Sequence, residues 1–294
     1  VIGVDAPDFN LGLEKRCKAA GLRTVHFVSP SVWAWREKRA ARIAESADRV
    51  LCLFPMEPPI YARYGVDAVF VGHPMADAVP LEPERAAARA ALDMHGDGRV
   101  LAILPGSRLS EIQRLLPVFL QAAVRIRQRQ PGIRFCIPAA DARCRRAIDA
   151  QLSIAGVDGM QVLDGQARTA MIAADAVLLA SGTAALEAML CKRPMAVAYR
   201  ISPLTYRLVK LLGLLKVERF SLPNALSGRE LVPELMQDDC TPERIADTLL
   251  PMLARDTPDP VLLAEYTRLH RLLKQDAADR AAEAVLALIG GGRA

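Results

Sequence analysis

The stretch Val100-Leu-Ala-Ile-Leu-Pro-Gly-Ser-Arg108 decides the fold class of this chain. Its five apolar residues, Val100–Leu104, predict a buried strand, a short turn follows, and a helical pattern comes next. The same order of apolar strand, polar loop and helix recurs along most of the chain. This alternation indicates an α/β fold built on parallel sheets.

Pro117 interrupts the helical pattern that follows this turn. Proline lacks the N–H that a helix interior uses, so it is best accommodated in a first turn. The pattern therefore predicts two helical pieces, with Pro117 in the first turn of the second.

The turn after the strand is a candidate anion site. Gly106 lets the backbone come close to a ligand, and the start of the next helix supplies free N–H groups for a negative charge. Arg108, with Ser107 beside it, adds a fork-shaped cation suited to a diphosphate. An exposed arginine on an ordinary strand–helix loop explains these residues equally well. No Gly-Lys-Ser/Thr follows, so the pattern is not a Walker loop.

A second loop repeats this arrangement after the apolar strand Ala176–Ala180. The small residues Ser181, Gly182 and Thr183 open it at the carboxyl end of the strand, where open parallel sheets bind ligands. Glu187 follows about one helical turn later, where its carboxylate could accept hydrogen bonds from a ribose diol. The alternative is an acid that interacts only with the helix dipole.

Two further segments carry candidate polar groups. The loop that contains Asn224 and Arg229 lies between apolar stretches and could contact a ligand or simply connect two elements. Asp5 follows the apolar residues 1–4, and a carboxylate at the carboxyl end of a strand is a candidate base. The neighbouring Asp8 could equally be a helix cap.

Trp35 and His73 are weaker candidates. Trp35 shares a loop with Trp33 and Arg36, and packing is the default role for at least one of the two indoles. His73 follows a strand beside a domain boundary, and a lone histidine is more often structural. No histidine pairs with a cysteine or an acid at metal-ligand spacing, so neither a metal site nor a cofactor is predicted.

Composition narrows the class of protein. The chain has 294 residues, of which 52% are hydrophobic, and its net charge of +5 is too small to predict nucleic-acid binding. No run approaches the length of apolar sequence that a membrane-spanning helix needs. The six cysteines form no CxxC pair and are predicted to be reduced.

The apolar pattern fades between Pro74 and Gly98, which predicts a domain boundary. We expect an N-terminal domain over residues 1–78, a linker over 79–98, a second domain over 99–250 and C-terminal helices over 251–294. The first residues read as the middle of a strand, so the first domain is expected to lack its beginning.

Taken together, several of these stretches resemble the lipid A disaccharide synthase family. The segments occur in family order over essentially the whole chain, and the tryptophan loop is the most specific of them. They are residues 4–10, 28–36, 71–77, 104–108, 179–187, 221–224 and 228–232. The family's Gly/Ser-rich N-terminal loop and its apolar membrane-facing surface precede residue 1 and have no counterpart in this sequence.

The resemblance implies a GT-B fold, in which two Rossmann-like domains face each other across a cleft. It implies transfer of 2,3-diacylglucosamine from its UDP derivative to 2,3-diacylglucosamine 1-phosphate, with inversion and without a metal. The products are UDP and the β-1,6-linked disaccharide 1-phosphate of lipid A biosynthesis. The nucleotide sugar would bind mainly to the C-terminal domain, and the last helices would return to the first domain.

The resemblance also assigns roles to residues. Asp5 matches the candidate base on the acceptor 6-hydroxyl, Arg108 the residue at the UDP diphosphate, and Glu187 the acid at the ribose. Further nucleotide contacts or cleft-lining positions correspond to Asn224, Arg229, His73 and Trp35.

A protein of this family is expected in the cytoplasm, bound peripherally to the inner face of the bacterial inner membrane, which is an anionic surface. Whether it forms a homodimer is left open. The basic residues Arg36, Lys38, Arg39 and Arg42 could bind acceptor phosphate or lipid headgroups, or form a solvated helix face. Residues 206–216 alternate apolar and basic side chains and could touch the bilayer or form a buried helix.

Two other classes of protein share the nucleotide-binding pattern. Other GT-B enzymes, such as a UDP-GlcNAc epimerase or a peptidoglycan transferase, should lack the tryptophan loop. A non-catalytic nucleotide-sugar binding module would have no transfer activity. Substituting Asp5 would therefore remove transfer only if the protein is an enzyme.

Overall fold

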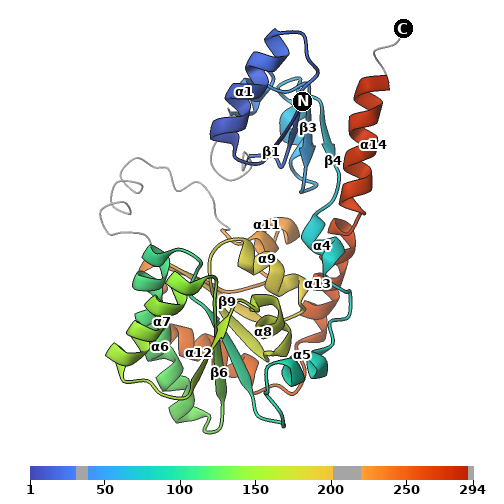
Figure 1. Ribbon diagram of the computed structural model, residues 1–294. Coiled ribbons are helices and arrows are strands. Elements are labelled where there is room, and N and C mark those ends of the chain that lie inside the picture. The colour runs from blue at the N-terminus through green and yellow to red at the C-terminus, as the bar shows by residue number, and fades with distance from the viewer. Residues whose placement is uncertain (31–38, 201–219, 291–294) are drawn as a thin grey trace. The chain divides into compact units, whose positions relative to one another are not determined.

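The computed structural model describes residues 1–30, 39–200 and 220–290 (Figure 1). The chain divides into two compact units. Of the described residues, the first contains those up to residue 79 and from 269 to 290, and the second contains residues 80–200 and 220–268. The division falls within helix α13 (Pro260–Leu273).

A parallel sheet organises the first unit. In its described part, four strands lie in the order β1-β2-β3-β4, which is also their order along the chain. The carboxyl ends of parallel strands share one edge, so Asp5, Ser29, Phe54 and His73, which follow the four strands, lie along that edge. The elements are β1 (Ile2–Val4), α1 (Pro7–Ala19), β2 (Val25–Phe27), α2 (Arg39–Ile43), β3 (Arg49–Cys52), α3 (Pro58–Ala62), β4 (Ala68–Phe70), α4 (Pro74–Ala78) and α14 (Ala277–Gly290).

Strand β3 contributes to the core on both faces of this sheet. Val50 and Cys52 pack in a cluster with Tyr61 on one face. Leu51 packs on the other face, in a cluster that includes Ala284 of α14 (Figure 1). Successive strand residues point to opposite faces, which is why one strand joins both clusters. A helix near the end of the chain therefore covers a sheet formed near its beginning.

A larger parallel sheet organises the second unit, in the order β10-β9-β8-β5-β6-β7. The predicted α/β fold with parallel sheets is confirmed, and the central strands β5 and β8 are buried along their whole length. The elements are α5 (Arg85–Ala91), β5 (Val100–Leu104), α6 (Leu109–Arg129), β6 (Arg134–Ala139), α7 (Ala142–Ala155), β7 (Met160–Asp164), α8 (Ala167–Ala173), β8 (Ala176–Ala180), α9 (Thr183–Leu190), β9 (Met195–Tyr199), α11 (Leu222–Ser227), β10 (Glu234–Met236), the 3-10 helix Gln237–Asp239, and α12 (Pro242–Leu253).

The predicted break at Pro117 is wrong. Helix α6 is continuous, with Pro117 in its interior. Its buried residues include Ile112, Leu116, Phe119 and Ile126, which recur at helical spacing and form one apolar face. Burial of this face offsets the interior proline, which costs about 3 kcal/mol.

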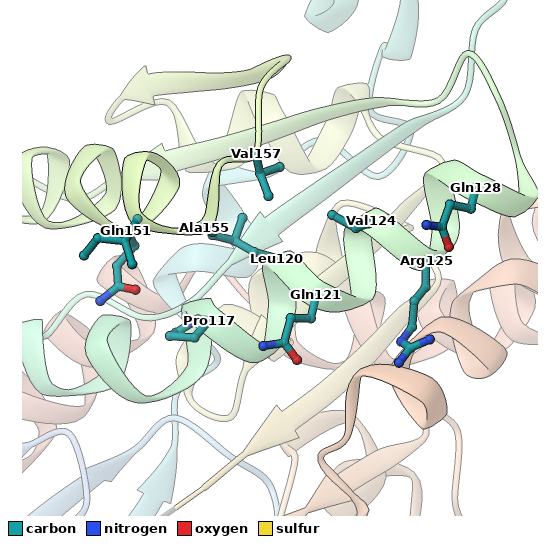
Figure 2. Close-up of a pocket in the computed structure, with 10 residues that line it drawn as sticks. Pro117, Leu120, Gln121, Val124, Arg125, Gln128, Gln151, Ala155 and Val157 are labelled. Atoms are coloured by element: carbon teal, nitrogen blue, oxygen red, sulfur yellow. The ribbon is translucent and has the colours of Figure 1, made fainter.

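Replacing Pro117 with alanine is expected to stabilise the protein. Pro117 is partly exposed and lines a groove between α6 and α7 (Figure 2), so alanine fits there and restores one backbone hydrogen bond. We expect the free energy of unfolding, measured by urea denaturation, to rise by about 1–3 kcal/mol. Gln121→Ala, on the same groove, is the control and should change it by less than about 0.5 kcal/mol. An unchanged or lower value for Pro117→Ala would show that the helix already accommodates the proline without cost.

Candidate functional site

A pocket of about 420 Å³ opens at the carboxyl edge of the second sheet. It lies beside β5 and β8, where the strand order reverses. Loops diverge from such a point in opposite directions and leave room for a ligand. The pocket unites the two loops singled out from the sequence, since its lining includes Gly106, Ser107, Arg108, Ser181, Gly182, Thr183 and Glu187.

Glu111 closes the first of these loops, a role that sequence reasoning missed. Gly106 has a φ of 117°, and a Cβ there would lie 2.4 Å from Glu111 Oε2. Arg108 donates to the same carboxylate, from Nη1 to Oε1 at 2.9 Å and from its backbone N to Oε2 at 3.3 Å. The Arg108 side chain remains 78% exposed, so its guanidinium has donors left for a ligand. An acid three residues after a loop is the capping-box spacing that could have revealed Glu111.

The second loop presents the start of α9 to the pocket. Gly182 precedes this helix, and among the described residues no side chain caps the helix here. Free amides and the positive end of the helix dipole favour an anion. With Arg108 on the first loop, the pocket is lined by groups that suit a negatively charged ligand.

Glu187 lines the same pocket, and an arginine orients it. Its Oε1 accepts a hydrogen bond from Arg168 Nε, on α8, at 2.9 Å. The Glu187 side chain is 19% exposed, so the carboxylate is held on the pocket wall with Oε2 available to a ligand. No spacing in the sequence links residues 168 and 187, so only the fold reveals this pair.

Asn224 and Arg229 do not line this pocket. Asn224 is buried, and its amide donates to Val232 O at 2.9 Å and to Glu234 Oε1 at 2.7 Å. Its Oδ1 accepts from two backbone N–H groups at residues 231 and 232. A nucleotide contact would break these bonds, so we infer that Asn224 shapes its loop. Arg229 is exposed, with Nη2 at 3.9 Å from Glu265 Oε2.

Asp5 is held in an uncommon backbone conformation at the carboxyl edge of the first sheet. Asp5 and Ala6 have φ of 50° and 42°, in the left-handed region that disfavours residues with a side chain. Asn10 Nδ2 stabilises this turn by donating to Val4 O at 3.0 Å and to Asp5 O at 2.8 Å. The Asp5 carboxylate is exposed and has no hydrogen-bond partner among residues 1–30, 39–200 and 220–290. Strain of this kind concentrates at functional sites.

His73 lies on the same edge of the first sheet. Its Nδ1 accepts a hydrogen bond from Met75 N at 3.1 Å and so caps α4, while its ring packs on Phe54 with centroids 5.4 Å apart. Burial lowers the pKa of His73 to about 4, so the ring is neutral at physiological pH. The nitrogen Nδ1 of His73 therefore has a structural role, the capping of α4.

Glu57 is a buried acid near this edge that sequence reasoning missed. It is 1% exposed and accepts a hydrogen bond from Phe54 N at 3.1 Å. Burial raises the pKa of Glu57 to about 7, because the charged form is disfavoured away from water. The surrounding sequence, with its three prolines, gave no sign that this glutamate would be inside the protein.

Glu57→Gln is expected to remove a pH dependence of stability. A carboxyl whose pKa rises on folding stabilises the protein fully below its unfolded pKa, and this contribution is lost as pH rises through the folded value of about 7. Between pH 4 and 9, the free energy of unfolding of wild type should therefore fall by about 3 kcal/mol relative to that of the variant. Urea denaturation across this range measures it, with the exposed Glu45→Gln as control above pH 5. Parallel profiles for wild type and Glu57→Gln would contradict the burial of an ionisable carboxyl.

Comparison with known proteins assigns the chain to a family. A sequence model described as lipid-A-disaccharide synthetase matches residues 1–287. The chain belongs to this family. The lipid-A-disaccharide synthase of Xanthomonas campestris pv. campestris strain 8004 is 58% identical over 290 residues, 98% of this chain and 66% of the relative. The enzyme of the same name from Xylella fastidiosa strain M23 is 56% identical over 98% of this chain and 76% of its own. The chain thus spans about two thirds of the Xanthomonas protein.

Solved structures share the fold of this lipid-A-disaccharide synthetase family member. A putative UDP-N-acetylglucosamine 2-epimerase from Listeria monocytogenes aligns with a TM-score of 0.63 at 12% identity, covering 99% of this chain and 74% of that one. A UDP-GlcNAc 2-epimerase from Neisseria meningitidis aligns with a TM-score of 0.62 at 11% identity, covering 97% and 75%. At such identities the likeness concerns the fold alone, which is of the GT-B type.

Some residues expected to act in the lipid-A-disaccharide synthetase family lie outside the described residues. They include Trp35 with its loop and the segment 206–216, for which bilayer contact and a buried helix were both left open. Arg42, from the predicted basic cluster, is exposed on α2. Within the described ranges, no helix is both long and apolar enough to span a membrane.

Proposed function

We propose that the chain carries the sugar-transfer machinery of a lipid A disaccharide synthase. In this reaction 2,3-diacylglucosamine passes from UDP to the 6-hydroxyl of 2,3-diacylglucosamine 1-phosphate. Family membership and the name shared by the Xanthomonas and Xylella relatives support this activity. The observation that carries the proposal is the pocket that unites Arg108, the start of α9 and Glu187.

The pocket suits a nucleoside diphosphate. Diphosphate oxygens would accept hydrogen bonds from Arg108 and from the amides at the start of α9, and the ribose diol would donate to Glu187. The ion pair with Arg168 presents the Glu187 carboxylate in one orientation. As the bond from the sugar C1 to the diphosphate breaks, charge grows on the departing UDP. Donors that are already in place stabilise that charge without reorganising.

Asp5 is the proposed base on the acceptor. The acceptor O6 forms a bond to the donor C1 while the bond from C1 to the diphosphate oxygen breaks, and the O6 proton passes to the Asp5 carboxylate. Both oxygens of this carboxylate are free of partners among the described residues, which leaves them available to the hydroxyl. Asn10, which bonds the backbone on either side of the turn, would act as a positioning residue.

The deciding experiment is a transfer assay with UDP-2,3-diacylglucosamine and 2,3-diacylglucosamine 1-phosphate. The chain spans about two thirds of the Xanthomonas relatives, so the assay uses a protein of the full family length. UDP release should match disaccharide formation one to one. Epimerisation of UDP-GlcNAc without transfer would favour an epimerase, and UDP binding without either reaction would favour a binding module.

We further propose that the protein works at the inner face of the inner membrane. Both substrates carry acyl chains and reside in a bilayer, so the reaction takes place at its surface. The net charge of +5 favours an anionic surface. Co-sedimentation with anionic vesicles, abolished by salt, is the expected result. Equal binding to neutral vesicles, or none to either, would contradict the electrostatic part of this proposal. Light scattering on the same preparation tests whether the protein is a homodimer.

A further inference from the structure

A cluster of arginines lies at the amino edge of the second sheet, away from the nucleotide pocket. Arg99 and Arg193 stand just before β5 and β9, and Arg85 and Arg89 belong to α5. Asp175, which precedes β8, lies among them. The five residues of β5 separate the two edges of the sheet by roughly 17 Å. The cluster is therefore distinct from the site at Arg108.

Asp175 is already saturated with hydrogen bonds. Its Oδ1 pairs with Arg85 Nη2 and lies 3.4 Å from Arg99 Nη1, while its Oδ2 lies 2.8 Å from Arg89 Nη2. Its Oδ2 also accepts from Val100 N at 2.7 Å. One buried carboxylate therefore forms ion pairs with three guanidinium groups. Of these, Arg99 has a second acid, Asp256, with its Nη2 2.5 Å from Oδ1.

Arg193 has no acid of its own. It is 7% exposed, and among the described residues its side chain makes no hydrogen bond or ion pair; its Nε is buried without a partner. Burial, followed by the charge of Arg85, lowers the pKa of Arg193 to about 10, so the group is still charged at neutral pH. A buried, unpaired charge is costly and calls for a counter-charge.

The positive charge extends beyond Arg193. The Nε of Arg85 is also buried without a partner. Burial, followed by the positive charges of Arg85 and Arg134, lowers the pKa of Arg89. Guanidinium groups thus outnumber the carboxylates Asp175 and Asp256 that face them. Unpaired N–H donors on converging arginines are the recognition chemistry of a tetrahedral oxyanion, which can accept several of them at once.

We propose that Arg193 and Arg85 form a binding site for a small phosphate-type oxyanion at the amino edge of the second sheet. The ligand would supply the negative charge that Arg193 lacks, because the Asp175 carboxylate is already fully hydrogen-bonded. The site would hold a free anion such as inorganic phosphate or sulfate, and would be occupied independently of the nucleotide pocket.

The test uses phosphate titrations against chloride at matched ionic strength, followed by calorimetry and by the melting temperature. In chloride, Arg193→Met should melt above wild type, because it removes a buried unpaired charge. In phosphate, wild type should gain stability and the variant should not, since its phosphate affinity is expected to fall about tenfold or more. Arg85→Met, at a more exposed position, should weaken phosphate binding in the same direction.

Two controls separate this site from others. Arg108→Met alters the nucleotide pocket and should leave this phosphate binding intact, as should Arg129→Met on the surface of α6. Loss of phosphate binding in Arg108→Met with retention in Arg193→Met would place the anion in the nucleotide pocket and overturn the proposal. The absence of any phosphate effect beyond that of chloride in wild type would overturn it as well.

Discussion

Asp5→Asn is expected to lower kcat for sugar transfer by about a thousandfold, within the range for loss of a general base. Asparagine keeps the size and tolerates the left-handed backbone, but it cannot take the proton of the acceptor hydroxyl. UDP affinity, which we propose depends on the pocket at Arg108, should stay within about twofold of wild type. Transfer is measured as disaccharide formed from the two lipid substrates, and UDP affinity by calorimetry.

The neighbouring positions supply matched controls for Asp5. Asp8→Asn changes another exposed carboxylate, in the first turn of α1, and should leave kcat nearly unchanged. Asp5→Gly should abolish transfer and yet stabilise the protein by about 0.5–1 kcal/mol, because glycine relieves the strain at a φ of 50°. Transfer that persists in Asp5→Asn would show that another group removes the proton.

Arg108→Met is expected to reduce kcat/KM by about a hundredfold to a thousandfold. The substitution removes the charged donor proposed to contact the diphosphate, and that contact strengthens as charge develops on the leaving group. UDP affinity should weaken by about ten- to a hundredfold, the equivalent of a charge-assisted hydrogen bond. Both quantities come from steady-state kinetics and UDP titration on the same preparation.

Two further variants test the role of Arg108 against a general loss of charge. Arg108→Lys keeps the charge without the fork, so it should recover part of the UDP affinity and less of kcat. Arg129→Met removes a cation from the far end of α6 and should change neither. Equal losses in Arg108→Met and Arg129→Met would indicate long-range electrostatics in place of direct contact.

The second sheet was predictable because its central strands are buried on both faces. Such strands appear in a sequence as uninterrupted apolar runs, and the predicted strands at Val100–Leu104 and Ala176–Ala180 agree with the structure residue for residue. Pro117 was misjudged for the opposite reason. A local rule about proline was overridden by the long apolar face of α6, whose burial is a tertiary effect.

The two loops that line the candidate pocket could be predicted from the sequence. The hydrogen-bond partners of the candidate polar side chains could not. Small residues after a buried strand identify a loop that can approach an anion, and both such loops line the pocket. Asn224, by contrast, looks like a surface contact in the sequence but is enclosed by its own loop, with its amide fully bonded. Polar identity alone does not tell whether a side chain faces a ligand or the backbone.

Periodicity and loop chemistry, which are local, thus determined most strands and helices and the two loops that line the pocket. The tertiary structure decided which charges meet. The Arg168–Glu187 pair and the unpaired Arg193 beside Asp175 come from packing between segments that no residue pattern encodes. The physical reason is that the spacing of hydrophobic residues is a property of each short segment. An ion pair or an unpaired charge depends instead on where distant segments come to lie.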